Sequence, residues 1–242
     1  TCKKVADVLL GALAPALPAR VVAHCHGGTL AIYSGVDPRN QEYFVDYEVY
    51  AGGSGARATK DGVDGVANHT TNTSNLPIEA LETEFPILVE RYEFVPDSGG
   101  AGRYRGGLGV VREVRSLGED LIVGGWGCDQ RAAPRGLFGG GEGVAGGFHI
   151  VDGTGAVLET VRSTVKGIAL PASGRLRVHT SGGGGYGDPL DRDPEDVLRD
   201  VRLGKVSSAH AGAAYGVVLA GDAVDVATTA RLRASRRESR PS

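Results

Sequence analysis

Apolar and polar residues alternate over short stretches along most of the chain, the period of a half-buried β-strand. Residues 42–50 show it most clearly, because Tyr43, Val45, Tyr47 and Val49 fall on one face of an extended segment. Comparable runs predict strands over 21–33, which is broken at a Gly-Gly pair, and over 87–95, 109–117, 120–127, 146–151, 156–162, 175–180 and 215–221.

Three stretches have helical spacing or helix-boundary residues instead. Residues 3–14 repeat apolar positions at helical spacing, interrupted by Asp7. Ile78–Glu84 is bounded by prolines, and 193–204 begins with a capping Asp-Pro and ends at a glycine. No repeat or linker precedes residue 228. We therefore predict an α+β fold, one mainly β domain with a few helices over 1–228, followed by a disordered Arg-rich tail over 229–242.

Glycine is unusually abundant, with 39 in 242 residues against an ordinary usage of about 7%. The glycine-rich segments lack the Lys-Ser/Thr of a phosphate-binding loop and the dinucleotide-binding fingerprint, so they do not predict a nucleotide site in this chain. The segment 182–187 predicts an ordered stretch packed against residues 97–107. Glycine there would serve positive φ angles or close backbone approach.

Charge and cysteine usage restrict the class of protein. Five arginines and one glutamate lie in the last fourteen residues, so the remaining chain is more acidic than the net charge of −3. This argues against a nucleic-acid partner, and the absence of an 18-residue apolar run argues against a membrane span. Three widely spaced cysteines predict no disulfide framework and favour a cytoplasmic location.

The sequence His24-Cys25-His26 is a weak metal-binding candidate. On a strand the two histidines share one face and the cysteine points to the other, so two ligands at most converge. The remaining histidines are isolated, and we assign no metal ligand from the sequence.

A polar loop and the following short helix collect amides and carboxylates that suit substrate binding or general-base catalysis. Glu79 and Glu82 are i, i+3 neighbours on one helical face and follow Asn72 and Asn75. The alternative is that these charges only stabilise the start of the helix.

The stretch NTSNLPIEALETEFPILVERYEFVPDSGGAGRYRGGLGVVREVR (72–115) resembles the signature of the hydantoinase B/5-oxoprolinase family. The closing block SGGGGYGDPLDRDPEDVLRDVRLGKVS with AGAAYGVVL (181–219) is similar to that family too, and 52–65 and 133–143 match in order. The resemblance covers residues 1–220 and only the C-terminal half of family members, which agrees with a chain that begins at a threonine.

The resemblance implies part of an ATP-dependent cyclic-amide hydrolase acting on hydantoin, 5-oxoproline or a lactam. An A-type partner subunit would bind ATP, and a divalent metal would lie in the N-terminal half of the B-type subunit. That half would pack on an exposed apolar face of this chain. Mapped residues would act in catalysis (Glu79, Glu82, Asp97) or bind the small cyclic-amide substrate (Asn72, Asn75, Ser98, Arg103, Arg105).

Three alternatives stay open. Thr1 could be an N-terminal nucleophile, released by self-cleavage and activated by its own α-amine. The chain could instead belong to a carboxylase-type subunit of the same family, or be a non-catalytic truncated remnant.

Overall fold

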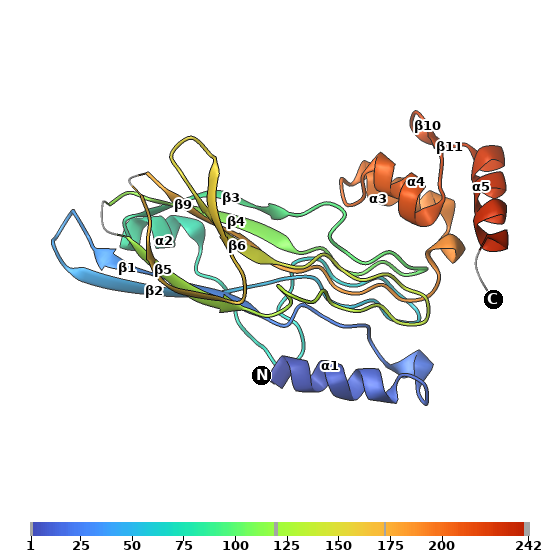
Figure 1. Cartoon of the computed structure of the whole chain (residues 1–242), viewed down its shortest axis with the longest axis horizontal. Coiled ribbons are helices and arrows are strands. Elements are labelled where there is room, and N and C mark those ends of the chain that lie inside the picture. The colour runs from blue at the N-terminus through green and yellow to red at the C-terminus, as the bar shows by residue number, and fades with distance from the viewer. Residues whose placement is uncertain (1, 119–120, 172, 240–242) are drawn as a thin grey trace.

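A computed structural model of the protein describes residues 2–118, 121–171 and 173–239. Two antiparallel sheets form the body (Figure 1). The four-stranded sheet has the order β2 (Tyr43–Tyr50), β1 (Thr29–Val36), β5 (Ile122–Gly127), β8 (Thr164–Ala169). The five-stranded sheet has the order β3 (Ile87–Phe94), β4 (Val110–Ser116), β9 (Arg175–His179), β6 (Gly147–Val151), β7 (Val157–Val161). The fold is mixed and mainly β, as the alternation predicts.

The main hydrophobic core lies between the two sheets. Tyr33 and Val123 come from the four-stranded sheet and pack in one cluster with Phe148 and Leu176 of the five-stranded sheet. The short helix α2 (Ile78–Glu84) adds the fully buried Leu81 to the same cluster. The two sheets and α2 therefore share one core, as in a β-sandwich.

Strand β2 turns its apolar face to the outside and its charged face into the sandwich, the reverse of the usual arrangement. Its alternating apolar residues do share one face, but Tyr43, Val45 and Tyr47 are 67%, 56% and 59% exposed. The face turned into the sandwich carries Asp46 and Glu48, both buried. Arg112 of β4 compensates this burial, because its guanidinium lies 2.8 Å from Glu48. The outward apolar face thus has no partner within the part of the chain that the structure describes.

Beyond the sheets, glycine-rich segments run side by side in extended conformation (Figure 1). Gly182–Gly185 are buried and form hydrogen bonds with several of them, including Gly184 N–H to His24 C=O and Gly183 N–H to Gly107 C=O, both 2.9 Å. A Cβ at Gly184 would lie 2.0 Å from the Arg135 carbonyl oxygen. The predicted packing against 97–107 is confirmed. Close approach, not a positive φ, explains the glycine at 184, as collagen requires glycine at its crowded axis.

Helices α3 (Pro194–Arg202), α4 (Ser208–Tyr215) and α5 (Val226–Glu238) form the C-terminal end, with the hairpin β10 (Leu219–Ala220) and β11 (Ala223–Val224) beside them (Figure 1). The prediction of disorder from 229 is wrong through residue 239. Arg233 of α5 donates to the backbone oxygens of Tyr215 and Arg192 at 3.0 and 2.9 Å. The arginines of the tail therefore fasten this helix to the body; residues 240–242 lie outside the described residues.

Other boundaries differ from the sequence prediction. Residues 21–28 pair with the glycine-rich segments, through Ala23 N–H to Ala56 C=O and His26 N–H to Gly53 C=O, so β1 begins only at Thr29. The sequence pattern predicts neither β8 nor α4, and in the expected strand 215–221 only Leu219–Ala220 (β10) are a strand, because residue 215 ends α4 and 216–218 are irregular. The remaining elements are two short 3-10 helices, η1 (Pro18–Arg20) and η2 (Pro189–Asp191).

Helix α1 (Cys2–Leu13) lies along the edge of the molecule (Figure 1). It buries its polar residues Lys3 and Asp7, while Val5, Val8 and Leu9 are 54%, 66% and 59% exposed. Its amphipathic pattern is therefore turned outward, like that of β2. No helix among the described residues is long and apolar enough to cross a membrane.

Candidate functional site

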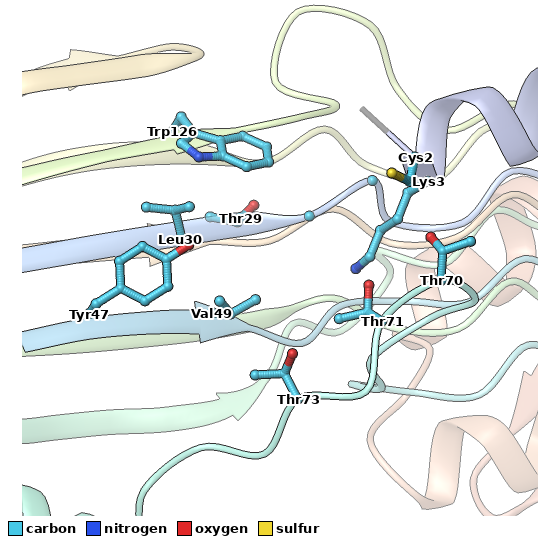
Figure 2. A pocket seen from close by; sticks show the side chains of 12 residues that line it. Cys2, Lys3, Thr29, Leu30, Tyr47, Val49, Thr70, Thr71, Thr73 and Trp126 are labelled. Atoms are coloured by element: carbon cyan, nitrogen blue, oxygen red, sulfur yellow. The ribbon is translucent and has the colours of Figure 1, made fainter.

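A pocket of about 220 Å³ lies where the N-terminus of α1 meets the four-stranded sheet (Figure 2). Its apolar walls come from the sheet and include Tyr47 and Trp126. Its polar side comes from the loop after residue 69, through the hydroxyls of Thr70, Thr71 and Thr73 (Figure 2). The predicted polar loop thus contributes three threonines to a pocket, whereas the predicted Asn72 and Asn75 do not line it.

Lys3 points into this pocket (Figure 2) and is only 9% exposed. Burial lowers the pKa of its amine, although nearby acidic groups oppose this effect. The structure records no ion pair for Lys3 within its described residues. A buried amine opposite two aromatic side chains suits a small ligand that has an apolar ring and a carbonyl or carboxylate oxygen.

Next to the pocket, Lys4 connects two acidic side chains. Its ammonium forms ion pairs with Asp129 and, at 3.4 Å, with Asp7. Burial alone would lower the pKa of Lys4, but these carboxylates raise it. Asp129 also accepts the Gly27 N–H at 2.6 Å. This network fixes the start of α1 against the turn before β1.

Asp7 also meets Cys25 and His69. Their ligand atoms all lie within 4.8 Å of one another. Asp7 Oδ1 accepts the Cys25 N–H at 3.3 Å and lies 3.6 Å from His69 Nε2. Burial raises the pKa of the Cys25 thiol to about 11, although the Gly55 N–H donates to the sulfur.

Sequence reasoning does not find this cluster. The sequence groups Cys25 with its neighbours His24 and His26, but His26 is fully buried elsewhere, with Nδ1 3.0 Å from Ser181 Oγ. Asp7 and His69 lie far apart in the sequence, and the only local signal is an aspartate that interrupts an apolar helical pattern.

The predicted residues around α2 have separate positions. Glu79 is exposed, whereas Glu82 accepts the Val89 N–H at 2.8 Å and so fastens α2 to β3. Asn75 donates to the Val49 C=O at 3.1 Å, and Asn72 is exposed. Helix α2 lies at the opposite end of the molecule from α3–α5 (Figure 1).

The other predicted residues lie where the glycine-rich segments meet the C-terminal helices. Asp97, with φ 61°, accepts the Ser207 N–H at the start of α4, 2.7 Å away. Ser98 is buried and accepts the Gly109 N–H at 2.9 Å. Arg103 is exposed, with its guanidinium carbon 5.6 Å from the centroid of the Tyr104 ring.

Arg105 belongs to a buried ionic network. Its guanidinium lies 3.1 Å from Asp64 and 3.5 Å from Asp200. Arg192 joins Asp200 to Asp61 at 2.7 Å each. The structure therefore brings Asp97, Ser98 and Arg105 into one region and keeps Glu79 and Glu82 away from it. Their catalytic and binding roles stay predictions.

The sequence profile of the hydantoinase B/oxoprolinase family matches residues 1–189. This chain belongs to that family. It is 34% identical over 231 residues to the B-type subunit of a putative D-/L-hydantoinase from Pseudomonas sp., covering 95% of this chain and 38% of the relative. It is 30% identical to the acetophenone carboxylase delta subunit of Aromatoleum aromaticum, covering 89% of this chain and 36% of the relative.

A solved structure agrees with this hydantoinase B/oxoprolinase fold. The ATP-dependent caprolactamase of Pseudomonas jessenii superimposes with a TM-score of 0.72 at 30% identity, over 92% of this chain and 40% of that chain. The chain thus spans about two fifths of the length of these three proteins. The resemblance stated from residues 72–115 and 181–219 is confirmed.

Proposed function

We propose that this chain is the part of a hydantoinase B/oxoprolinase-type subunit that works in an ATP-dependent cyclic-amide hydrolase. The names of its relatives support this proposal, since one is the B-type subunit of a putative hydantoinase and another an ATP-dependent caprolactamase. Its substrate would be a hydantoin, 5-oxoproline or lactam ring.

Such a ring needs activation before water can attack it. An unstrained amide is a poor electrophile, and phosphorylation of its oxygen creates a leaving group. We assign ATP binding to an A-type partner subunit, and we assign a divalent metal to the part of the B-type subunit that this chain does not match. The chain would then supply a docking surface and part of the substrate environment.

The structural observation that supports the docking part of this proposal is the outward face of the four-stranded sheet. Cross-strand neighbours there form the rows Val49–Leu30–Trp126 and Tyr47–Ile32–Gly124. Tyr47 and Trp126 are 59% and 41% exposed, whereas Leu30 is buried beneath them. Monomers seldom expose large contiguous apolar patches. We propose that the occupant is the remaining part of a B-type subunit, because the matched relatives are more than twice as long as the matched region.

The test is reconstitution with that remaining part and an A-type subunit. Association and ATP-dependent ring opening should appear together only in the full mixture. Tyr47→Glu should weaken association at least tenfold, because it places a charge on the docking face. Leu203→Glu, at a residue 61% exposed beyond α3, is the matched control and should change nothing. Equal binding by Tyr47→Glu and the unaltered chain would refute the docking face.

A carboxylase is the second candidate, favoured by the similarity to the acetophenone carboxylase delta subunit. The reconstituted complex distinguishes the two. ATP hydrolysis that requires bicarbonate and a ketone would indicate carboxylation, whereas ring opening without bicarbonate indicates hydrolysis. A complex that assembles but turns over no substrate would favour the non-catalytic remnant. The threonine alternative depends on Thr1, which lies outside the described residues.

A further inference from the structure

We propose that Asp7, Cys25 and His69 form a binding site for a zinc-type divalent cation. The three residues come from α1, from the extended segment before β1, and from the loop that lines the pocket of Figure 2. They supply one carboxylate oxygen, one sulfur and one imidazole nitrogen. Zinc binds this donor set, commonly with three protein ligands and one open position.

The spacing of the donor atoms suits a tetrahedral ion. Metal–ligand bonds of about 2.0–2.3 Å place tetrahedral ligands about 3.3–3.8 Å apart. Asp7 Oδ1 and His69 Nε2 are 3.6 Å apart, within that range. All three atoms lie within 4.8 Å of one another, so the sulfur needs to move by about 1 Å at most.

Asp7 Oδ1 accepts the Cys25 N–H and the Cys25 sulfur accepts the Gly55 N–H, and each keeps a further lone pair for a metal. His69 Nε2 is buried and has no hydrogen-bond partner, since its distance to Asp7 is too long for a hydrogen bond. Lys4 binds the other oxygen of Asp7, Oδ2, and holds the carboxylate in place. Outer contacts of this kind orient metal ligands in known sites.

The site has an approach from solvent, and the charged groups around it are mainly cations. His69 lines a cavity of about 530 Å³ beside α1, together with Arg57. Lys3 and Arg57 are the cations near Cys25 and Lys4 is the cation at Asp7, while Asp129 is the acidic group outside the ligand set that offsets Lys3 and Lys4. A divalent ion is therefore held mainly by its three direct ligands. It would join α1 to the loop at residues 68–75 and so fix the polar wall of the neighbouring pocket.

The experiment loads the metal-free chain with Co²⁺, which reports its ligands by absorption, and with Zn²⁺ followed by dialysis and metal analysis. We expect one equivalent of either ion, a sulfur-to-cobalt charge-transfer band and the visible spectrum of tetrahedral cobalt. Cys25→Ser should abolish the charge-transfer band. His69→Gln should weaken metal affinity about tenfold or more.

The matched controls are Cys128→Ser and His24→Gln, which change a half-buried cysteine and histidine outside the cluster. Both should retain the full spectrum and stoichiometry. Circular dichroism of each variant shows whether it is folded, and Asp7→Asn is compared only if it folds. Failure of the unaltered chain to retain metal would overturn the proposal. So would a charge-transfer band that survives Cys25→Ser and disappears with Cys128→Ser.

Discussion

Replacing Gly184 by alanine tests most directly whether the glycine-rich segments pack as closely as the structure shows. The added Cβ would lie 2.0 Å from the Arg135 carbonyl oxygen and 2.5 Å from its carbonyl carbon. Both atoms belong to backbone that is itself packed, so the segments must separate by more than 1 Å. Overpacking of this kind costs about 1–3 kcal/mol.

The same movement strains two hydrogen bonds. Gly184 N–H donates to the His24 C=O, and its own C=O accepts the Ala56 N–H, both at 2.9 Å. Each such bond contributes about 0.5–1.5 kcal/mol net. We therefore expect Gly184→Ala to lower the free energy of unfolding by about 2–6 kcal/mol in total.

Two further substitutions calibrate the result in urea unfolding measurements. At Gly141 the nearest backbone atom would be 3.3 Å from the added Cβ, so Gly141→Ala should cost about 1 kcal/mol. Gly212 lies in α4 with 3.9 Å of space, so Gly212→Ala should stabilise by about 0.5–1 kcal/mol. If Gly184→Ala is as stable as Gly212→Ala, the close approach does not exist and the reasoning fails. If Gly184→Ala does not fold, the unfolding free energies of Gly141→Ala and Gly212→Ala still show whether the space around each glycine predicts the effect of an added Cβ.

The remaining predictions concern charged residues. Glu82→Gln should lower the melting temperature, because it weakens the hydrogen bond from the Val89 N–H. Glu79→Gln should leave the melting temperature unchanged and, if Glu79 is a general base, reduce turnover of the reconstituted complex about 10²–10⁴-fold. Unchanged turnover would reject that role. Arg192→Met removes the 2.7 Å partner of Asp61 and Asp200, although Arg105 remains 3.5 Å from Asp200. The free energy of unfolding should therefore fall by about 3 kcal/mol in chemical denaturation, the lower end for a broken buried ion pair. Burial would raise the pKa of Asp61, but Arg192 holds it below the ordinary value. The resulting stabilisation is complete above about pH 4 and decreases as the pH falls through the lowered pKa. Asp61→Asn should therefore flatten the acid limb of a curve of stability against pH, and a curve identical to that of the unaltered chain would contradict the shift.

Local sequence rules determined the secondary structure where neighbouring residues alone decide it. Alternation located β2, β4 and β9, because side chains on successive strand residues point to opposite faces whatever the sheet packs against. The capping Asp193 and the following proline fixed the start of α3, where the side chain accepts the Glu195 N–H. The co-linear motifs also identified the family, since they span most of the chain.

Only the tertiary structure decided which face of an element is buried. Tyr47 lies outward and Glu48 inward because Arg112, from the other sheet, pairs with that carboxylate. The tail from residue 229 continues as a helix because its arginines reach carbonyl oxygens of distant segments. Neither partner is adjacent in sequence, so composition alone predicts an inward apolar face and a free basic tail.

The same limit applies to the candidate sites. Residues 7, 25 and 69 each have little significance alone, and they form a donor set only because α1, an extended segment and a loop meet at one point. The high glycine content predicted that backbone segments pack closely, but not which ones. The distance between a Cβ at Gly184 and its nearest neighbour depends on a segment almost fifty residues away. Periodicity and caps are properties of neighbouring residues and are visible in the sequence. Burial, charge pairing and ligand geometry depend on distances between remote segments, which the folded chain alone sets.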